Sequence, residues 1–195
     1  YPIVRMDWAH GQTLAAFVAA HRTDADVLQQ LRMSLRGVSR ELRRHGIAHG
    51  DIQPTNVIVE SASQLRLIDY DGLFVPQLAS LQSAELGQRN FQHSGRRGRH
   101  FDASLDSFAF SLLDLTLHAL CRRPELWEQS ESDADAFILR AADIADPADS
   151  PAFSLLASVP ELEQRVRNFA AICAAPFEQV PTFEDFLEGR NIPTR

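Results

Sequence analysis

The hydrophobic positions between Thr23 and Gly46 recur at the spacing of an amphipathic helix. Apolar residues stand three or four positions apart, at Leu28, Leu31, Leu35, Val38 and Leu42. This spacing places them along one face of a helix. Thr23 is a candidate N-cap with Asp26 as its capping-box partner, and Gly46 is a stop signal. The pattern predicts one long helix between Thr23 and Gly46.

Five arginines of the same segment lie mostly off this apolar stripe, at Arg32, Arg36, Arg40, Arg43 and Arg44. They could form a basic docking face or an ordinary solvated helix surface. We expect the solvated surface, because the outward face of an amphipathic helix normally carries charged residues.

The rest of the chain predicts short strands, a long loop and further helices. Residues 57–59 and 65–68 are apolar runs around a polar turn, which indicates a β-hairpin. Residues 72–100 show little periodicity, and an irregular loop of that length is usually functional. Further elements are expected at residues 3–6 (strand-like), 14–21, 104–120, 161–174 and 183–188 (helices). The predicted fold class is α+β, predominantly α, in one domain.

Net charge, the length of apolar runs and the cysteine content exclude several classes of protein. The net charge of −7 argues against nucleic acid or an anionic membrane as a partner. No apolar run approaches the ~20 residues that span a bilayer. The two cysteines, Cys121 and Cys173, lie far apart and lack metal spacing, which favours a reducing cytoplasm.

Two polar segments flank the predicted hairpin and carry the candidate chemistry. Residues 49–56 offer Asp51 and Asn56, and residues 67–72 offer Asp69. A hairpin brings the loop before its first strand beside the end of its second, so we expect these side chains to converge. Amide and carboxylate oxygens suit Mg²⁺, and a further carboxylate can orient a hydroxyl and accept its proton. Phosphoryl transfer depends on such positioning and charge neutralisation.

The same segments resemble the catalytic loop of protein kinases, His-Arg-Asp-Leu-Lys-Pro-Glu-Asn, and their Asp-Phe-Gly metal motif. Here they read His-Gly-Asp-Ile-Gln-Pro-Thr-Asn and Asp-Tyr-Asp-Gly, with the usual gaps of five and thirteen positions between the three polar residues. The resemblance implies ATP- and Mg²⁺-dependent phosphoryl transfer to a Ser or Thr hydroxyl of a protein substrate. Asp51 and Gln53 would be catalytic, and Asn56 and Asp69 would hold the metal.

The resemblance covers most of the chain and implies the C-terminal lobe of a kinase-like domain. Its parts would be a hinge (1–14), the catalytic and metal loops (47–72), the activation segment (72–101) and a helical subdomain (102–195). The nucleotide site would comprise a gatekeeper, two backbone contacts to adenine and two residues at the base of the pocket: Met6, Asp7, Ala9, Ile58 and Ile68. Asp106 matches a buried acid that braces the catalytic-loop backbone, and such an acid needs hydrogen-bond donors. We expect Asp106 to be structural.

Several positions depart from the family pattern. Gly50 replaces an Arg that usually clamps a phosphorylated activation loop, and His-Gly-Asp also begins this loop in aminoglycoside phosphotransferases. Gln53 replaces a Lys that neutralises the transferring phosphoryl, so slow turnover is expected. Asp71 displaces the glycine of the metal motif and could add a metal ligand or cap the turn; we expect it to cap the turn. Residues 90–94, Asn-Phe-Gln-His-Ser, stand in place of Ala-Pro-Glu and resemble bacterial kinase-like proteins.

The Gly-rich phosphate loop, the strand Lys and the helix Glu of the family have no counterpart here. All three belong upstream of the hinge. We therefore expect the smaller N-terminal lobe on preceding residues of the same polypeptide, and weak ATP binding by this chain alone.

The predicted activation segment also carries four arginines without interspersed acids, at Arg89, Arg96, Arg97 and Arg99. They could recognise an acidic substrate or a phosphate, or they could belong to a mobile solvated loop. The sequence favours the solvated loop.

Three functions stay open. An ATP-dependent Ser/Thr protein kinase is the leading hypothesis. A small-molecule kinase would need helical insertions that build an acceptor pocket, whereas residues 72–100 suggest an extended, peptide-facing loop. A pseudokinase scaffold is favoured by Gln53 and Asp71 but opposed by the retention of Asp51, Asn56 and Asp69, so catalysis is preferred.

Overall fold

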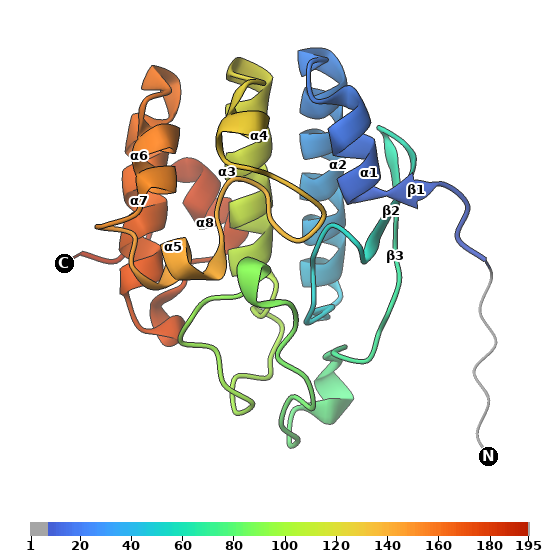
Figure 1. Cartoon of the computed structure of the whole chain (residues 1–195). Helices are drawn as coiled ribbons and strands as arrows, with labels where there is room; N and C mark the ends of the chain where they lie inside the picture. Colours follow the sequence, from blue (N-terminus) through green and yellow to red (C-terminus); the bar gives the residue numbers. More distant parts are fainter. Residues whose placement is uncertain (1–7, 195) are drawn as a thin grey trace.

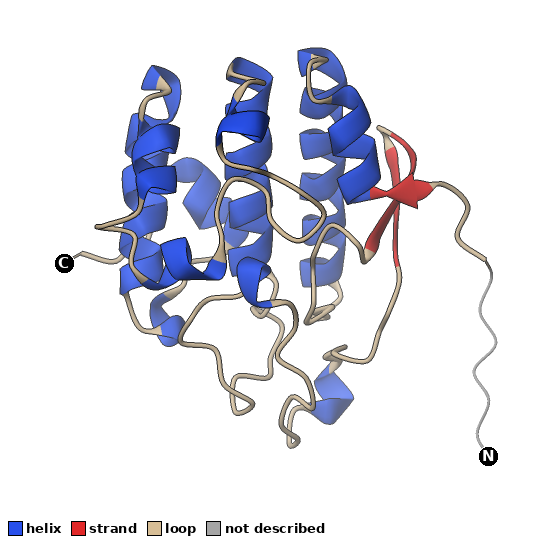
Figure 2. Ribbon diagram, viewed as in Figure 1, coloured by secondary structure: helices blue, strands red, loops and turns tan. Residues whose placement is uncertain are grey.

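The computed structural model describes residues 8–194, which form mainly helices with one small sheet at the edge (Figure 1, Figure 2). Three groups of helices stand side by side, with α3 between α2 and the pair α6 and α7 (Figure 1). This arrangement is compatible with the predicted α+β class. The strand-like run at residues 3–6 lies outside the described residues. The helices are α1 (Leu14–His21), α2 (Ala25–Arg44), α3 (Ser107–Arg122), α4 (Leu126–Gln129), α5 (Ala141–Ala145), α6 (Pro151–Ala157), α7 (Glu163–Ala174) and α8 (Phe183–Glu188).

The sheet contains the predicted hairpin and one further strand. β2 (Val57–Ser61) pairs antiparallel with β3 (Gln64–Leu67), which confirms the hairpin. β1 (Gln12–Thr13) pairs with the other edge of β2 and was not predicted, because two residues are too few to show a strand pattern. Val57 and Val59 belong to the main hydrophobic core, whereas Ile58 between them does not. Successive residues of a strand face opposite ways, so Ile58 lies on the face of β2 away from that core.

Helix α2 follows the predicted apolar stripe but has a different cap. Leu28, Leu31 and Leu35 are buried, as expected. The N-cap is Asp24, whose Oδ1 accepts the N–H of Val27 at 3.1 Å. The predicted cap at Thr23 is therefore wrong by one residue, since either side chain can accept such a bond and only the fold selects between them.

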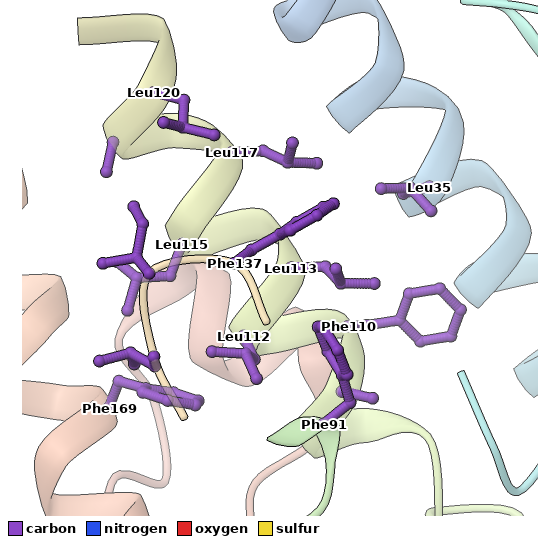
Figure 3. Packing of buried hydrophobic residues seen from close by; sticks show 14 of the residues in the cluster. Leu35, Phe91, Phe110, Leu112, Leu113, Leu115, Leu117, Leu120, Phe137 and Phe169 are labelled. Carbon is purple, nitrogen blue, oxygen red and sulfur yellow. The ribbon is translucent and has the colours of Figure 1, made fainter. Parts of the chain in front are cut away.

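Helix α3 is the centre of the core. Twelve of its sixteen residues are buried, so it is enclosed on nearly all sides. Figure 3 shows its leucines between Leu35 of α2, Phe137 of the loop between α4 and α5, and Phe169 of α7. It starts a turn later than the predicted helix at residues 104–120. None of the helices within residues 8–194 has both the length and the apolar character that a membrane crossing requires.

The arginines of α2 do not all lie on a solvated surface, which corrects the expectation for two of them. Asp114 of α3 is 2% exposed and binds Arg32 at 3.1 Å and Arg36 at 2.8 Å. Arg165 of α7 lies 3.5 Å from the same carboxylate. A buried carboxylate requires such partners, so it draws both α2 arginines inward and links α2, α3 and α7.

The predicted long loop is confirmed. Between β3 and α3 the chain contains only two short 3₁₀ turns, η1 (Pro76–Leu78) and η2 (Arg89–Phe91). The segment runs across one end of the helices, at the foot of Figure 1. Further 3₁₀ turns flank α7, η3 (Pro160–Leu162) before it and η4 (Phe177–Gln179) after it.

Candidate active site

A buried acid holds the loop that carries Asp51. The carboxylate of Asp106, just before α3, accepts the N–H of His49 at 2.6 Å and the N–H of Gly50 at 2.8 Å. Burial raises the pKa of Asp106, and these two donors and the charge of Arg96 oppose the rise. The structural role predicted for Asp106 is confirmed, because it fixes the backbone immediately before Asp51.

The carboxylate of Asp51 is held by three donors. Its Oδ2 accepts the side-chain amides of Gln53 at 2.7 Å and Asn56 at 3.0 Å. Its Oδ1 accepts the backbone N–H of Gln88 at 2.8 Å, from the long loop. A carboxylate has about four acceptor positions, so three are filled and one on Oδ1 is available to a further donor.

The amide of Asn56 has a fixed orientation. Its Nδ2 donates both to the Asp51 carboxylate and to the Asp51 carbonyl oxygen, the second at 3.1 Å. Its Oδ1 accepts no hydrogen bond from the described residues. Asn56 is thus a buried side chain with its donor group used and its oxygen available, which is the arrangement a metal ligand needs.

Backbone bonds bring the segment before Asp69 to Asn56. The N–H of Ile68 donates to the Asn56 carbonyl at 3.0 Å, and the Ile68 carbonyl bonds to Nε2 of His49 at 2.9 Å. Asp69 follows directly, with an exposed side chain and a φ of 66°. A non-glycine residue in this region is strained, and such strain often occurs at functional sites. Asp69 as a metal ligand stays a prediction.

Asp71 does not act as the predicted turn cap. Its side chain is exposed and accepts no hydrogen bond from residues 8–194. The turn is closed by the backbone instead, where the N–H of Leu73 donates to the Tyr70 carbonyl at 3.0 Å.

The predicted nucleotide site is only partly described. Met6 and Asp7 lie outside the described residues, and Ala9 is half-buried next to an exposed Trp8. Ile58 lies on the face of the sheet away from the core, and Ile68 is half-buried at the end of the hairpin. Their contact with a nucleotide stays a prediction.

The arginines of the long loop differ in their surroundings. Arg96 is 3% exposed, which contradicts the expectation of a solvated side chain. Its Nη1 donates to the Gly50 carbonyl and to Oε1 of Gln92, each at 2.6 Å. Burial lowers the pKa of Arg96, and the charges of Asp106 and Asp51 oppose this. The long loop therefore reaches the backbone of Gly50 through Arg96.

A divalent cation of the magnesium type fits the available donors better than a transition metal. Within residues 8–194, no group of three or more His, Cys, Asp or Glu side chains could hold a metal ion. Mg²⁺ instead binds through one or two protein oxygens and completes its shell with water and substrate phosphates. Asn56 and Asp69 are the side chains that could serve it.

Sequence reasoning missed three contacts of this site, made by Gln88, Gln92 and Arg96. All three come from the irregular loop, which has no periodicity from which to infer its path. The run of arginines was the only signal, and it did not distinguish the buried Arg96 from its exposed neighbours.

Comparison with known proteins gives a distant similarity to protein kinases. The chain is 25% identical, over 187 residues, to the dual specificity mitogen-activated protein kinase kinase dSOR1 of Drosophila melanogaster. The similarity covers 86% of this chain and 46% of that protein, so the chain spans about half the length of the relative it matches. No family model matches the chain. The similarity suggests a relationship to protein kinases and, in general terms, phosphotransfer.

Proposed function

We propose that the chain is the catalytic, C-terminal lobe of an ATP- and Mg²⁺-dependent kinase that phosphorylates Ser or Thr hydroxyls of a protein substrate. Its smaller lobe, with the Gly-rich loop and the strand Lys, would precede it in the same polypeptide. The distant similarity to a protein kinase kinase over most of the chain supports this proposal.

The arrangement around Asp51 is the observation that carries the proposal. Three donors hold the carboxylate in one orientation and leave one acceptor position on Oδ1. A substrate hydroxyl that donates to this position would be aligned for attack, and Asp51 would accept its proton. The brace from Asp106 keeps the loop rigid during this step.

Asn56 and Asp69 are the proposed metal ligands. Asn56 offers an oriented oxygen, and Asp69 an exposed carboxylate that follows Ile68, whose backbone is bonded to Asn56. A bound Mg²⁺ would neutralise charge on the phosphates of ATP. Ile58, Ile68 and Ala9, with Met6 and Asp7, would contact the adenine.

The long loop supports a protein rather than a small molecule as the acceptor substrate. Residues 72–100 contain only two short 3₁₀ turns, so this part of the chain has no helical insertion that could build a closed pocket for a small acceptor. An irregular loop beside Asp51 is suited to binding an extended peptide.

One observation favours a binding scaffold as the second candidate. The side-chain amide of Gln53 donates to Asp51, and Gln88 donates to the other oxygen. Protein kinases have a charged lysine at this position, whereas Gln53 is neutral and its amide already donates to Asp51. The missing positive charge would lower the rate of phosphoryl transfer.

Transfer of labelled phosphate from ATP to a generic protein substrate tests the proposal. The full-length polypeptide would be compared with its Asp51→Asn variant, which keeps the size of the side chain but is a much poorer base. We expect the rate to fall by about 10²–10⁴-fold. Asp149→Asn is the matched control, because Asp149 is exposed and lies in the loop before α6.

Two results would reject the proposal. Equal labelling by the parent protein and Asp51→Asn would remove Asp51 from the role of base. Absence of transfer from any nucleotide, with unaltered binding of a protein partner, would support the scaffold.

A further inference from the structure

A cavity of about 500 Å³ lies within the long loop. Its walls include Gly87, Gln92 and the arginines discussed below. Gly87 connects it to the site: a Cβ built on Gly87 would lie 2.5 Å from Oδ1 of Asp51. Gly87 therefore lies between the cavity and the oxygen that has an available acceptor position.

Three of the four loop arginines line this cavity: Arg89, Arg96 and Arg97. None of them forms an ion pair with an acid among residues 8–194. Their neighbour Arg99 does, because it binds Glu178 at 3.2 Å outside the cavity. Arg97 donates instead to the carbonyl oxygens of Ser94 and Arg96, which add no negative charge to compensate it. The cavity thus carries an excess of positive charge in an acidic protein.

The buried Arg96 is a second observation that points to an anion at this cavity. Its Nη1 is bonded to Gly50 and Gln92, but its Nε and Nη2 have no partner among the described residues. The charges of Asp106 and Asp51 act on this guanidinium, but neither carboxylate accepts a hydrogen bond from it. Buried polar atoms without a partner are rare in native proteins and can mark a place where a ligand binds. An anion in the cavity would add negative charge close to Arg96.

The position of the cavity limits the ligand to a group near the acceptor hydroxyl. An extended peptide advances by about 3.3–3.6 Å per residue. A substrate whose hydroxyl donates to Asp51 would therefore place a side chain one or two residues away at the cavity.

We propose that the cavity formed around Arg89, Arg96 and Arg97 binds an acidic side chain of the protein substrate, a carboxylate or a phosphate, one or two residues from the phosphorylated hydroxyl. This inference rests on the proposed function and specifies the substrate class of the same site. Planar carboxylates and phosphates both match the donors of arginine.

Peptides with a single acceptor serine test this inference. Glutamate, phosphoserine or glutamine would be placed at each of the two positions before and after the serine. The full-length protein should phosphorylate the best acidic peptide with a kcat/KM about tenfold above its glutamine counterpart. Preference for glutamate identifies a carboxylate as the ligand, and preference restricted to phosphoserine identifies a phosphate. Either supports the inference.

The role of the cavity arginines is tested by changing the two exposed ones, Arg89 and Arg97. In the double variant Arg89→Gln, Arg97→Gln the ratio between acidic and glutamine peptides should fall close to one. Arg40→Gln, an exposed arginine on α2, is the matched control and should keep the ratio. A ratio that survives the double variant would overturn the inference.

Failure of this inference is distinguishable from failure of the proposed function. Transfer that depends on Asp51 but shows no acidic preference at any position would reject the cavity as a substrate site and leave the proposed kinase activity in place.

If no peptide is phosphorylated, fluorescence anisotropy measures the binding of the same peptides directly. Tighter binding of the acidic peptides by the parent protein than by the double variant supports the inference, and equal binding of acidic and glutamine peptides overturns it.

Discussion

The backbones of Gly50 and Gly72 approach so closely that a Cβ on Gly50 would overlap the carbonyl oxygen of Gly72. Gly50 also has a φ of 83°, which side chains other than glycine rarely adopt. This contact joins the loop of Asp51 to the loop of Asp69. A glycine at position 50 is therefore required by the geometry of this chain.

Gly50→Ala should destabilise the protein strongly. The added Cβ must displace the backbone at Gly72, and the positive φ adds strain, together about 2–4 kcal/mol in the free energy of unfolding. Chemical denaturation measures the loss. Gly37→Ala is the matched control: it lies in α2 with nothing within 4 Å of an added Cβ and should be stabilising by about 0.5–1 kcal/mol. Equal stabilities of the two variants would contradict the close contact.

Removal of the charge of Asp114 should be equally severe. Asp114→Ala leaves Arg32, Arg36 and Arg165 without their shared carboxylate, and Arg32 is itself buried. Breaking a buried ion pair on one side costs about 3–5 kcal/mol. Glu163→Ala, which removes an exposed carboxylate from Arg167 on α7, should cost no more than about 0.5 kcal/mol. A loss for Asp114→Ala as small as for Glu163→Ala would show that the cluster contributes little.

Most of the longer helices were predictable from their apolar positions. The predicted helix at residues 14–21 and the predicted helix at residues 183–188 match α1 and α8 in both bounds. α4, α5 and α6 were missed. Helices of seven residues or fewer contain few turns in which a period can show, and of those within residues 8–194 only α8 was predicted.

The candidate site was predictable as a motif but not as a set of contacts. Local spacing indicated that Asp51 and Asn56 belong together, and the structure joins them by a hydrogen bond. The contact from Gln88 crosses 37 positions of the chain through an irregular loop. Likewise, a helix face cannot reveal that Arg32 meets a buried acid 82 positions later. Such contacts depend on tertiary packing, which leaves no trace in a local pattern.

His118 should make the stability of the protein sensitive to mild acid. Burial, followed by the charges of Arg32 and Arg165, lowers the pKa of His118 from 6.5 to about 4. The unfolded chain thus takes up a proton first as the pH falls. Above about pH 7, His118 is neutral in both states and the protein keeps its full stability. As the pH falls from about 6.5 towards 4, protonation of the unfolded chain lowers the free energy of unfolding.

We expect this loss to be about 1–2 kcal/mol, reduced by solvent screening because His118 is only half-buried. Denaturation of the parent protein and His118→Gln between pH 4.5 and 7 measures it. His118→Gln should show a weaker dependence on pH, whereas the exposed control His10→Gln should retain the parent slope. Identical slopes for the parent and His118→Gln would contradict the shift.

Gln53→Lys should accelerate phosphoryl transfer if the chain is a slow kinase. The amide nitrogen of Gln53 lies 2.7 Å from Oδ2 of Asp51, so a lysine at this position would place its positive charge beside the reacting hydroxyl. A charged donor stabilises the developing negative charge of the phosphoryl group better than a neutral amide. We expect kcat to rise about tenfold in full-length protein. A rate that stays unchanged or falls would show that the amide itself is needed to orient Asp51. Gln30→Lys, an exposed change of the same charge on α2, controls for net charge and should leave kcat unaltered.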